Sequence, residues 1–152
     1  MRVSSFFLSS YQQTDLTKVA RIPSDVTINN DATYNDSTDL SIPIQINSVY
    51  VIDMWLVFSS SAVADFKMTF KAITDATASW NPVDVHSPNA LTDDQLFNGG
   101  GVGTDQCYHI HGVLTTGAGS TENLIVRYCQ ANAEATDTVL SSKTALVLTK
   151  VA

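Results

Sequence analysis

The sequence predicts an all-β protein, an antiparallel β-sandwich of the jelly-roll kind with about eight strands and an extended amino-terminal arm. Two neighbouring segments carry this prediction. Residues 64–71 alternate strictly, with Phe66, Met68 and Phe70 on one side and polar side chains on the other, as in a strand with one dry and one wet face. Residues 49–58 form a nearly continuous apolar run rich in β-branched and aromatic residues, which is typical of a strand covered on both sides.

Composition and charge narrow the function classes. At 152 residues the chain has the length of one ordinary domain. Charged residues are only 15% of it and are fewer than the Ser and Thr residues. The net charge of −7 and the scattering of eight Lys and Arg from Arg2 to Lys150 argue against nucleic acid as a partner. No apolar run approaches the ~20 residues that a membrane span needs, so no membrane partner is expected.

The amino terminus and the cysteines bear on the cellular compartment. Residues 1–8 carry one positive charge and too short an apolar stretch for a secretory signal, so we expect a protein made and kept in a cytoplasm. In a reducing compartment Cys107 and Cys129 are expected as free thiols. The alternative is a disulfide between opposite strands of a hairpin, which would stabilise the fold by roughly 3 kcal/mol.

The first part of the chain divides into an arm and strands. Residues 1–24 lack a sustained period, so we assign them to an amino-terminal arm that lies on its own sandwich or on a neighbouring subunit, and residues 25–152 to the jelly-roll sandwich domain. After the polar turn-forming residues 29–37, apolar residues alternate over residues 40–46 and predict a strand. Pro43 lacks an N–H donor, which places this strand at a sheet edge or marks a bulge.

The regular pattern is lost between residues 74 and 106. Residues 80–82 and 87–89 resemble turns, residues 91–97 can form one helical turn, and the glycine-rich residues 99–103 are expected to form a loop. Irregular stretches of this length in a compact domain are usually functional or interfacial. We therefore expect the main contact region here.

Regular strands return in the last third of the chain. Residues 108–114 and 124–129 alternate on either side of a glycine-bearing turn, and we interpret them as the two strands of a hairpin. A polar turn over residues 132–137 precedes a last strand over residues 144–151. Strands that recur with short turns in this way indicate a sandwich or jelly roll, and no clear tandem repeat is present.

A pair of histidines is the most specific candidate for a metal site. Gly103, followed after five residues by His109 and His111, matches the opening of the cupin metal motif, and histidines two apart on a strand share a face. The rest of that motif is missing, because no glutamate follows at the required spacing and no histidine occurs after His111. We interpret both histidines as polar-face residues at a subunit boundary, where they can respond to pH. No metal, no cofactor and no catalytic residue is predicted.

Three further groupings have ordinary structural explanations. Four polar side chains lack the spacing of an EF-hand loop and are better explained as turn formers than as a calcium site. They are those of Asp31, Asn35, Asp36 and Asp39. The glycines of residues 99–103 lack the Gly-Lys-Ser/Thr ending of a phosphate loop. Cys107 lies two residues from His109 on one strand, whereas a catalytic pair normally comes from different elements, so we predict no enzyme.

The two tryptophans are assigned to different environments. Trp55 lies within the apolar run, on a mixed face with Asp53, and we expect it to pack in the core between the sheets. Trp80 lies in the irregular region beside Asn81 and Pro82. Because Trp is enriched at interfaces, Trp80 is the better candidate for a contact residue.

Six segments of the predicted sandwich carry a family resemblance. They are residues 26–44, 49–58, 65–70, 112–117, 124–131 and 146–151. Together they resemble the small jelly-roll structural domains of tailed bacteriophages, over roughly residues 25–152 and without a catalytic signature. The resemblance implies a homotrimer that is seated on the capsid or forms the tip of a tail fibre. The histidines and cysteines are not part of it, so it transfers no site residues.

The resemblance leaves two functions open, which differ in what precedes the domain. A fibre protein normally carries a long shaft or coiled-coil stalk before its knob, and residues 1–24 show no heptads. We therefore expect a non-enzymatic decoration or cement protein on the capsid surface of the virion, where it binds between subunits of the major capsid protein and stabilises the head. The alternative is a receptor- or carbohydrate-binding knob of a tail fibre.

Overall fold

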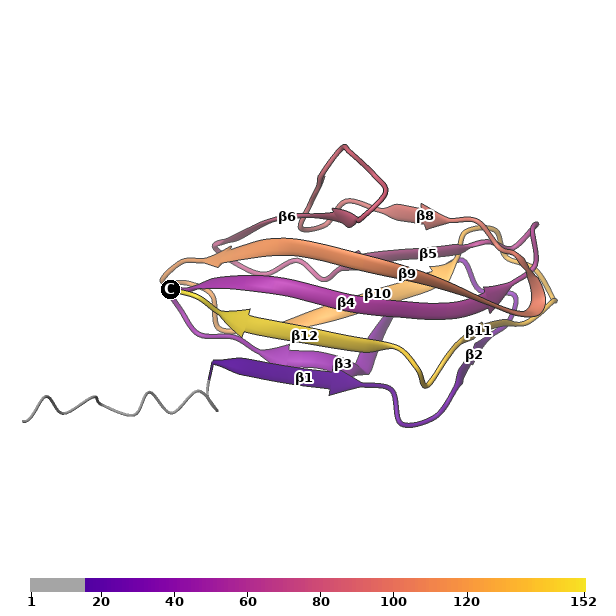
Figure 1. Cartoon of the computed structure of the whole chain (residues 1–152), viewed down its shortest axis with the longest axis horizontal. Coiled ribbons are helices and arrows are strands. Elements are labelled where there is room, and N and C mark those ends of the chain that lie inside the picture. The colour runs from indigo at the N-terminus through magenta and orange to yellow at the C-terminus, as the bar shows by residue number, and fades with distance from the viewer. Residues whose placement is uncertain (1–15) are drawn as a thin grey trace, which may run out of the picture.

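The structure, a computed structural model, describes residues 16–152, and these form two antiparallel sheets packed face to face (Figure 1). In chain order the strands are β1 (Thr17–Arg21), β2 (Val26–Ile28), β3 (Asn35–Pro43), β4 (Val49–Ser60), β5 (Phe66–Phe70), β6 (Ala76–Pro82), β7 (Asn89–Ala90), β8 (Gln95–Phe97), β9 (Gly101–Thr116), β10 (Asn123–Gln130), β11 (Thr138–Leu140) and β12 (Ala145–Lys150). The prediction of an all-β sandwich is confirmed. Without the two- and three-residue strands β2, β7, β8 and β11, eight strands remain in the described part of the chain.

The two sheets differ in size. The large sheet has eight strands in the order β1-β12-β4-β9-β6-β7, with β11 and β2 attached beside β4. The small sheet has four, in the order β3-β10-β5-β8. Pro43 lies in β3, one of the two edge strands of the small sheet, as its missing N–H predicts.

The core lies between the inward faces of the two sheets. In β5 the side chains of Phe66, Met68 and Phe70 are fully buried and Lys67 is partly exposed, which confirms the predicted alternation. Thr69 is buried as well, although it occupies a position on the predicted wet face. Aromatic rings fill much of the interior; those of Phe58 and Phe66 stack with centroids 4.7 Å apart.

Strand β4 is covered on both sides along only part of its length. From Val49 to Trp55 buried and more exposed residues alternate, and continuous burial begins at Leu56. The second half of β4 is covered because β11 and the turn before β12 pack beside it. For example, the hydroxyl of Thr144 in that turn donates to the Val57 carbonyl oxygen at 3.0 Å. The expectation of a strand buried on both faces is therefore wrong for residues 49–55.

Strand β1 lies inside the segment assigned to the arm. It pairs with β12 along its whole length, from Thr17 opposite Thr149 to Arg21 opposite Ala145. The expectation that all strands follow residue 24 is therefore wrong for residues 17–21, which gain their order from pairing with the far end of the chain. Residues 1–15 lie outside the described part, so the assignment of an arm stays a prediction there.

The expected hairpin of β9 and β10 does not form. β9 pairs with β4 and β6 in the large sheet, whereas β10 pairs with β3 and β5 in the small sheet. The turn between them thus crosses from one sheet to the other. Both strands alternate in sequence because each presents one face to the shared core, and this pattern alone does not distinguish a hairpin from a crossing.

The region expected to be irregular contains short strands. Residues 80–82 belong to β6 rather than to a turn, residues 95–97 form β8, and no helical turn occurs over 91–97. Residues 99 and 100 form a connection as expected, while 101–103 begin β9. The glycines there are needed, because Gly101 and Gly103 have φ of 114° and 73° next to a register shift between β4 and β9.

Candidate functional site

The candidate site is the side of the large sheet that faces away from the core, which we call the outer face. Three rows of residues cross it from β1 through β12, β4 and β9 to β6. The rows are Thr17-Thr149-Val51-Val113-Ser79, Val19-Val147-Asp53-His111-Asn81 and, reaching β9, Arg21-Ala145-Trp55-His109. Figure 1 looks onto this face, with β4 and β9 in front of the small sheet.

Large apolar side chains are exposed on the outer face. Val19 is 63% exposed, Trp55 49%, Val113 45% and Val51 41%. Val51 and Val113 are direct cross-strand neighbours, and Val147 lies beside Val19 on the adjoining strand. Apolar side chains that gather on one face of a soluble protein mark a contact surface more often than scattered ones do.

The most specific contacts on the face surround Trp55. Its ring stacks on that of His109, the cross-strand neighbour, with centroids 4.4 Å apart and planes 7° from parallel. His109 Nε2 is hydrogen-bonded to a carboxylate oxygen of Asp53. Because a carboxylate can only accept, the N–H of Nε2 is the donor of this hydrogen bond. The His111 ring lies 6.4 Å from that of His109 at a steep angle. The carboxylate and the stack together fix the orientation of a half-exposed indole.

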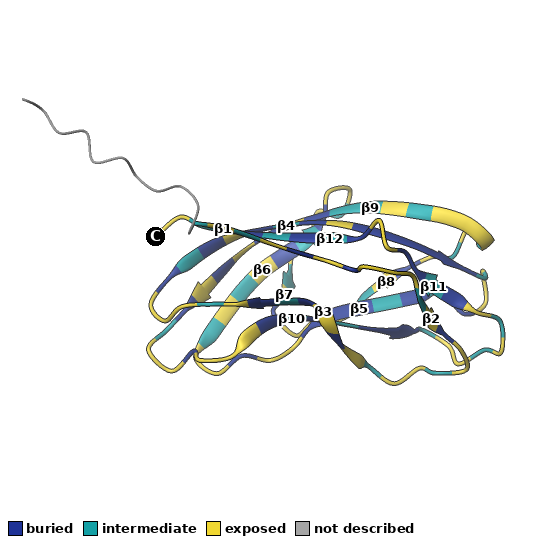
Figure 2. Ribbon diagram, turned by 90° about the horizontal axis from the view of Figure 1, so that it is seen from below, coloured by how far each residue is buried: buried dark blue, intermediate teal, exposed yellow. Residues whose placement is uncertain are grey.

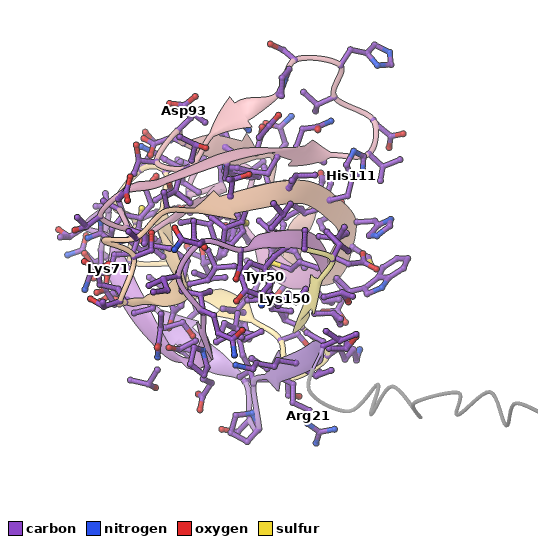
Figure 3. All side chains as sticks on the ribbon, turned by 90° about the vertical axis from the view of Figure 1, so that its left-hand side faces the viewer. Arg21, Tyr50, Lys71, Asp93, His111 and Lys150 are labelled. Carbon is purple, nitrogen blue, oxygen red and sulfur yellow. The ribbon has the colours of Figure 1, made fainter. Side chains whose placement is uncertain are left out.

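Charge is sparse on the outer face although the whole chain carries −7. Its three rows contain one carboxylate, Asp53, which is bonded to His109, and one cation, Arg21, at the β1 edge. His111 and Lys71 lie on opposite sides of the sandwich (Figure 3), so the cluster of histidines is remote from the charged small sheet. Low charge combined with valine and tryptophan is the composition of the centre of a protein interface.

The structure reverses the expected environments of the two tryptophans. Trp80 is fully buried, where its ring meets Phe70 edge-on at 5.1 Å and its Nε1 donates to the Ala90 carbonyl oxygen at 2.7 Å. Gly112 makes room for it, since a Cβ there would lie 2.6 Å from the Trp80 Cβ. Trp55 is the exposed one. The sequence did hold a signal, because Trp55 shares strand parity with Asp53 and not with the buried Met54.

The histidine pair does not form part of a metal centre in the described residues. His109 and His111 share the outer face, as their spacing predicts, but no group of three or more His, Cys, Asp or Glu side chains able to hold an ion occurs within residues 16–152. Whether the pair lies at a subunit boundary stays a prediction.

Two carboxylates of the polar cluster expected to form turns, those of Asp31 and Asp36, are engaged within the chain. Asp31 accepts hydrogen bonds from the Thr33 backbone N–H and from Asn35 Nδ2, and these bonds lower the pKa of its carboxyl. Asp36 binds Lys71 at 2.6 Å and Arg127 at 2.7 Å. Carboxylates committed in this way act as structural groups rather than as a calcium cage.

The cysteines lie in different sheets and are free thiols. Cys107 is exposed on the outer side of β9 and Cys129 is buried in β10. Burial raises the pKa of the Cys129 thiol to about 11. Within residues 16–152, no helix is long and apolar enough to cross a membrane.

Comparison with known proteins gives distant structural similarities. No family model and no curated protein matches the chain. A chain from the structure of infectious bursal disease virus, Gx strain, is 17% identical, with a TM-score of 0.42 over 88% of this chain and 33% of that one. A chain of the tripod from the baseplate of bacteriophage Tuc2009 is 7% identical, with a TM-score of 0.41 over 98% of this chain and 72% of the other. Both similarities are distant, and this chain spans about a third of the first of these chains.

Proposed function

We propose that the protein is a non-enzymatic structural component of a tailed-phage virion, a decoration or cement protein that binds between subunits of the major capsid protein. The observation that supports this proposal is the outer face, whose three rows combine exposed valines and Trp55 with polar side chains that are mostly uncharged. A small substrate needs a concave pocket with convergent polar groups, whereas a flat sheet face suits the surface of another protein. Trp55 is the anchor of that contact, because large aromatic side chains dominate the energetics of interfaces.

The size of the face favours several copies acting together. Five strands about 4.8 Å apart and five residues of about 3.4 Å give an area on the order of 400 Å². A stable complex buries about 800 Å² on each partner, so one copy alone would bind weakly. A homotrimer that presents three such faces to neighbouring capsid subunits gains avidity without new contacts. The proposal therefore includes a homotrimer on the capsid surface.

The test uses heads that lack the protein. Trp55→Ser should reduce the number of copies that pellet with undecorated heads and should reduce protection against heat release of DNA. The matched control is Leu96→Ser, which removes an equally exposed apolar side chain from the small sheet. Equal attachment of both variants would contradict a contact through the outer face, and no binding by the unaltered protein would contradict the capsid role.

The amino-terminal segment supplies a second test of the same proposal. Deleting residues 1–10 removes Phe6, Phe7 and Leu8 but none of the twelve strands, so the sandwich should fold and melt as before. Attachment to heads should weaken, because the apolar area of the segment is buried only on assembly. Full occupancy and full protection of heads by the shortened protein would remove the segment from the mechanism.

A receptor- or carbohydrate-binding tail knob is the second candidate. The observation that favours it is the half-exposed indole of Trp55 beside Asp53 and the two histidines, since an aromatic face with nearby hydrogen-bonding groups can stack on a sugar ring. Antibody labelling of virions separates the two functions. Even labelling of the head supports the decoration protein, and labelling at the tail tip supports the knob. A knob that binds carbohydrate should also show quenching of Trp55 fluorescence when a glycan is added.

A further inference from the structure

Where β6 begins, one edge of the large sheet has no partner strand among residues 16–152. On one side β6 pairs with β9 along its whole length, but on the other side only Ser79 and Trp80 pair with β7. In an antiparallel strand the N–H and C=O of a residue point to the same side and successive residues alternate. Within residues 76–78, at least one residue therefore directs both groups away from β9, towards a position that no strand in the described part of the chain occupies.

This edge lacks the features that usually prevent pairing. Exposed edges are commonly blunted by charged residues or proline. β1 has Lys18 and Arg21 and β3 has Pro43, whereas residues 76–78 read Ala-Thr-Ala. The start of β6 is thus open to the addition of an extended segment.

An apolar groove adjoins the same edge. It has a volume of about 250 Å³ and no charged side chain in its lining. It is lined by Ala72, Ile73, Ala76, Thr77, Ala78, Ala90, Leu91 and Thr92. Pockets for small molecules usually have about 300–1,000 Å³, so this groove is better suited to one or two apolar side chains. An open backbone edge beside an apolar groove is the arrangement used in strand addition.

We propose that the segment Phe6-Phe7-Leu8 of a second copy of this chain adds to the β6 edge and places apolar side chains in the groove. In an extended strand Phe6 and Leu8 point to the same side, which matches a groove on one side of β6. Neither the segment nor the groove carries charge, so the contact costs no charge desolvation.

The position of residue 16 favours a second copy over the same chain. Leu16 accepts a hydrogen bond from the Lys150 backbone N–H, in the row that continues through Tyr50 and Leu114 to Ala78. The origin of the segment and the open edge therefore lie at opposite edges of one sheet, and a segment reaching its own groove must cross four strand spacings, about 19 Å. A neighbour placed beside β1 presents its groove directly. In such a head-to-tail contact each copy donates one segment and accepts another, and the proposed trimer is the case in which three copies close into a ring.

This inference rests on the proposed homo-oligomer but does not depend on the proposed binding to the capsid. Its experiment contains no heads, so failure here leaves the attachment test untouched. Sedimentation of the purified full-length protein is compared with two variants, deletion of residues 1–10 and Ala78→Glu, which introduces a carboxylate into the groove. The matched control is Ala62→Glu, which makes the same substitution at an exposed residue of the turn after β4, outside the groove lining.

The expected result is loss of assembly in both variants and retention in the control, with a dissociation constant raised at least about tenfold. The decisive sample mixes the two variants, because the deletion form keeps a groove and Ala78→Glu keeps a segment. The mixture should form a two-chain complex that neither variant forms alone. Chymotrypsin should cut after Phe6 and Phe7 more slowly in the full-length protein than in Ala78→Glu. The ratio of the two cleavage rates should match the ratio of the two dissociation constants.

Several results would overturn the proposal. These are assembly by Ala78→Glu that equals the full-length protein, a mixture without a complex, or a monomeric full-length protein whose segment is protected at every concentration. If Ala78→Glu fails to fold, Ala90→Glu replaces it, since Ala90 lines the same groove and is exposed.

Discussion

The outer sides of the two sheets share a scaffold but differ in how their polar groups are satisfied. On the small sheet Asp36 holds both Lys71 and Arg127, and Lys67 lies 3.6 Å from Asp94. The Tyr34 ring lies against the cations, 5.4 Å from the Arg127 guanidinium carbon and 5.7 Å from Lys67 Nζ. This side satisfies its charges internally and buries the residues beneath them.

The outer face of the large sheet has no comparable cover. Trp55 and Val19 stay exposed, and the carboxylate of Asp53 is hydrogen-bonded to His109. The ion pair of Lys143 with Asp105 lies near the far end of β9. Figure 2 shows that the first residues of β9 are mostly exposed, whereas buried and exposed residues alternate in its second half. We call the outer side of the small sheet the closed side, because its ion pairs form within one chain. We expect the open side, the outer face of the large sheet, to gain stability when another surface covers it.

The largest expected effect tests the core that both sides share. Met68→Asp places an unpaired carboxylate at a fully buried position of β5 and should unfold or strongly destabilise the domain. Met68→Leu keeps an apolar side chain of similar size and should be tolerated, with a cost below about 1.5 kcal/mol. Thermal unfolding measures both.

Lys67→Ser is the control for that experiment. Lys67 faces outward from the same strand, and its partly exposed pair with Asp94 is worth about 1 kcal/mol or less. A loss of melting temperature in Lys67→Ser equal to that in Met68→Asp would show that the faces of β5 are assigned wrongly.

The second effect separates the two tryptophans. Trp80→Ala empties a packed site and orphans the Ala90 carbonyl oxygen, so it should cost about 3–5 kcal/mol of unfolding free energy. Trp55→Ala loses a half-exposed stack on His109 and should cost about 1 kcal/mol or less while weakening attachment to heads. Denaturant unfolding of the two variants measures the contrast, and similar costs would contradict it.

These tryptophans also show what the sequence can and cannot predict. Strict alternation in residues 64–71 predicted β5 and its buried face, because a single amphipathic strand is encoded locally. Residues 49–58 were interpreted as buried on both sides. The residue type alone misled here, because valine and tryptophan occur both in a core and on an exposed contact face. The outer face therefore escaped prediction, although the parity of Trp55 with Asp53 points to it.

Pairing between distant strands was the other limit. β9 and β10 were taken as a hairpin because they are neighbours in sequence, yet they lie in different sheets. β1 was missed because its order comes from β12, more than a hundred residues away. The groove beside β6 exists because β7 pairs with only two residues of β6. The alternation of residues within one strand does not predict how long its neighbouring strand is.

The third effect concerns the closed side and acid. Lys71 and Arg127 hold the pKa of the Asp36 carboxyl below its usual value, so the pair stabilises the fold at neutral pH and is lost as pH falls through that lowered pKa. Because the carboxylate is more than a third exposed, solvent screening keeps the contribution below about 1 kcal/mol. Asp36→Asn should lower stability slightly at pH 7 and flatten the loss of stability below pH 4. Equal acid dependence in both proteins would contradict the assignment.

The smallest effect leaves stability unchanged and compares the two sides through their thiols. Cys107 is exposed on the outer side of β9, whereas Cys129, opposite Lys67 on the closed side, is fully buried. Burial also raises the pKa of the Cys129 thiol to about 11, so little of its thiolate exists at pH 8. At that pH a disulfide reagent should modify one thiol of the folded protein quickly and the second only after unfolding by denaturant. Cys107→Ser should abolish the fast reaction. Two thiols reacting at the same rate in the folded protein would show that the small sheet is as open as the large one.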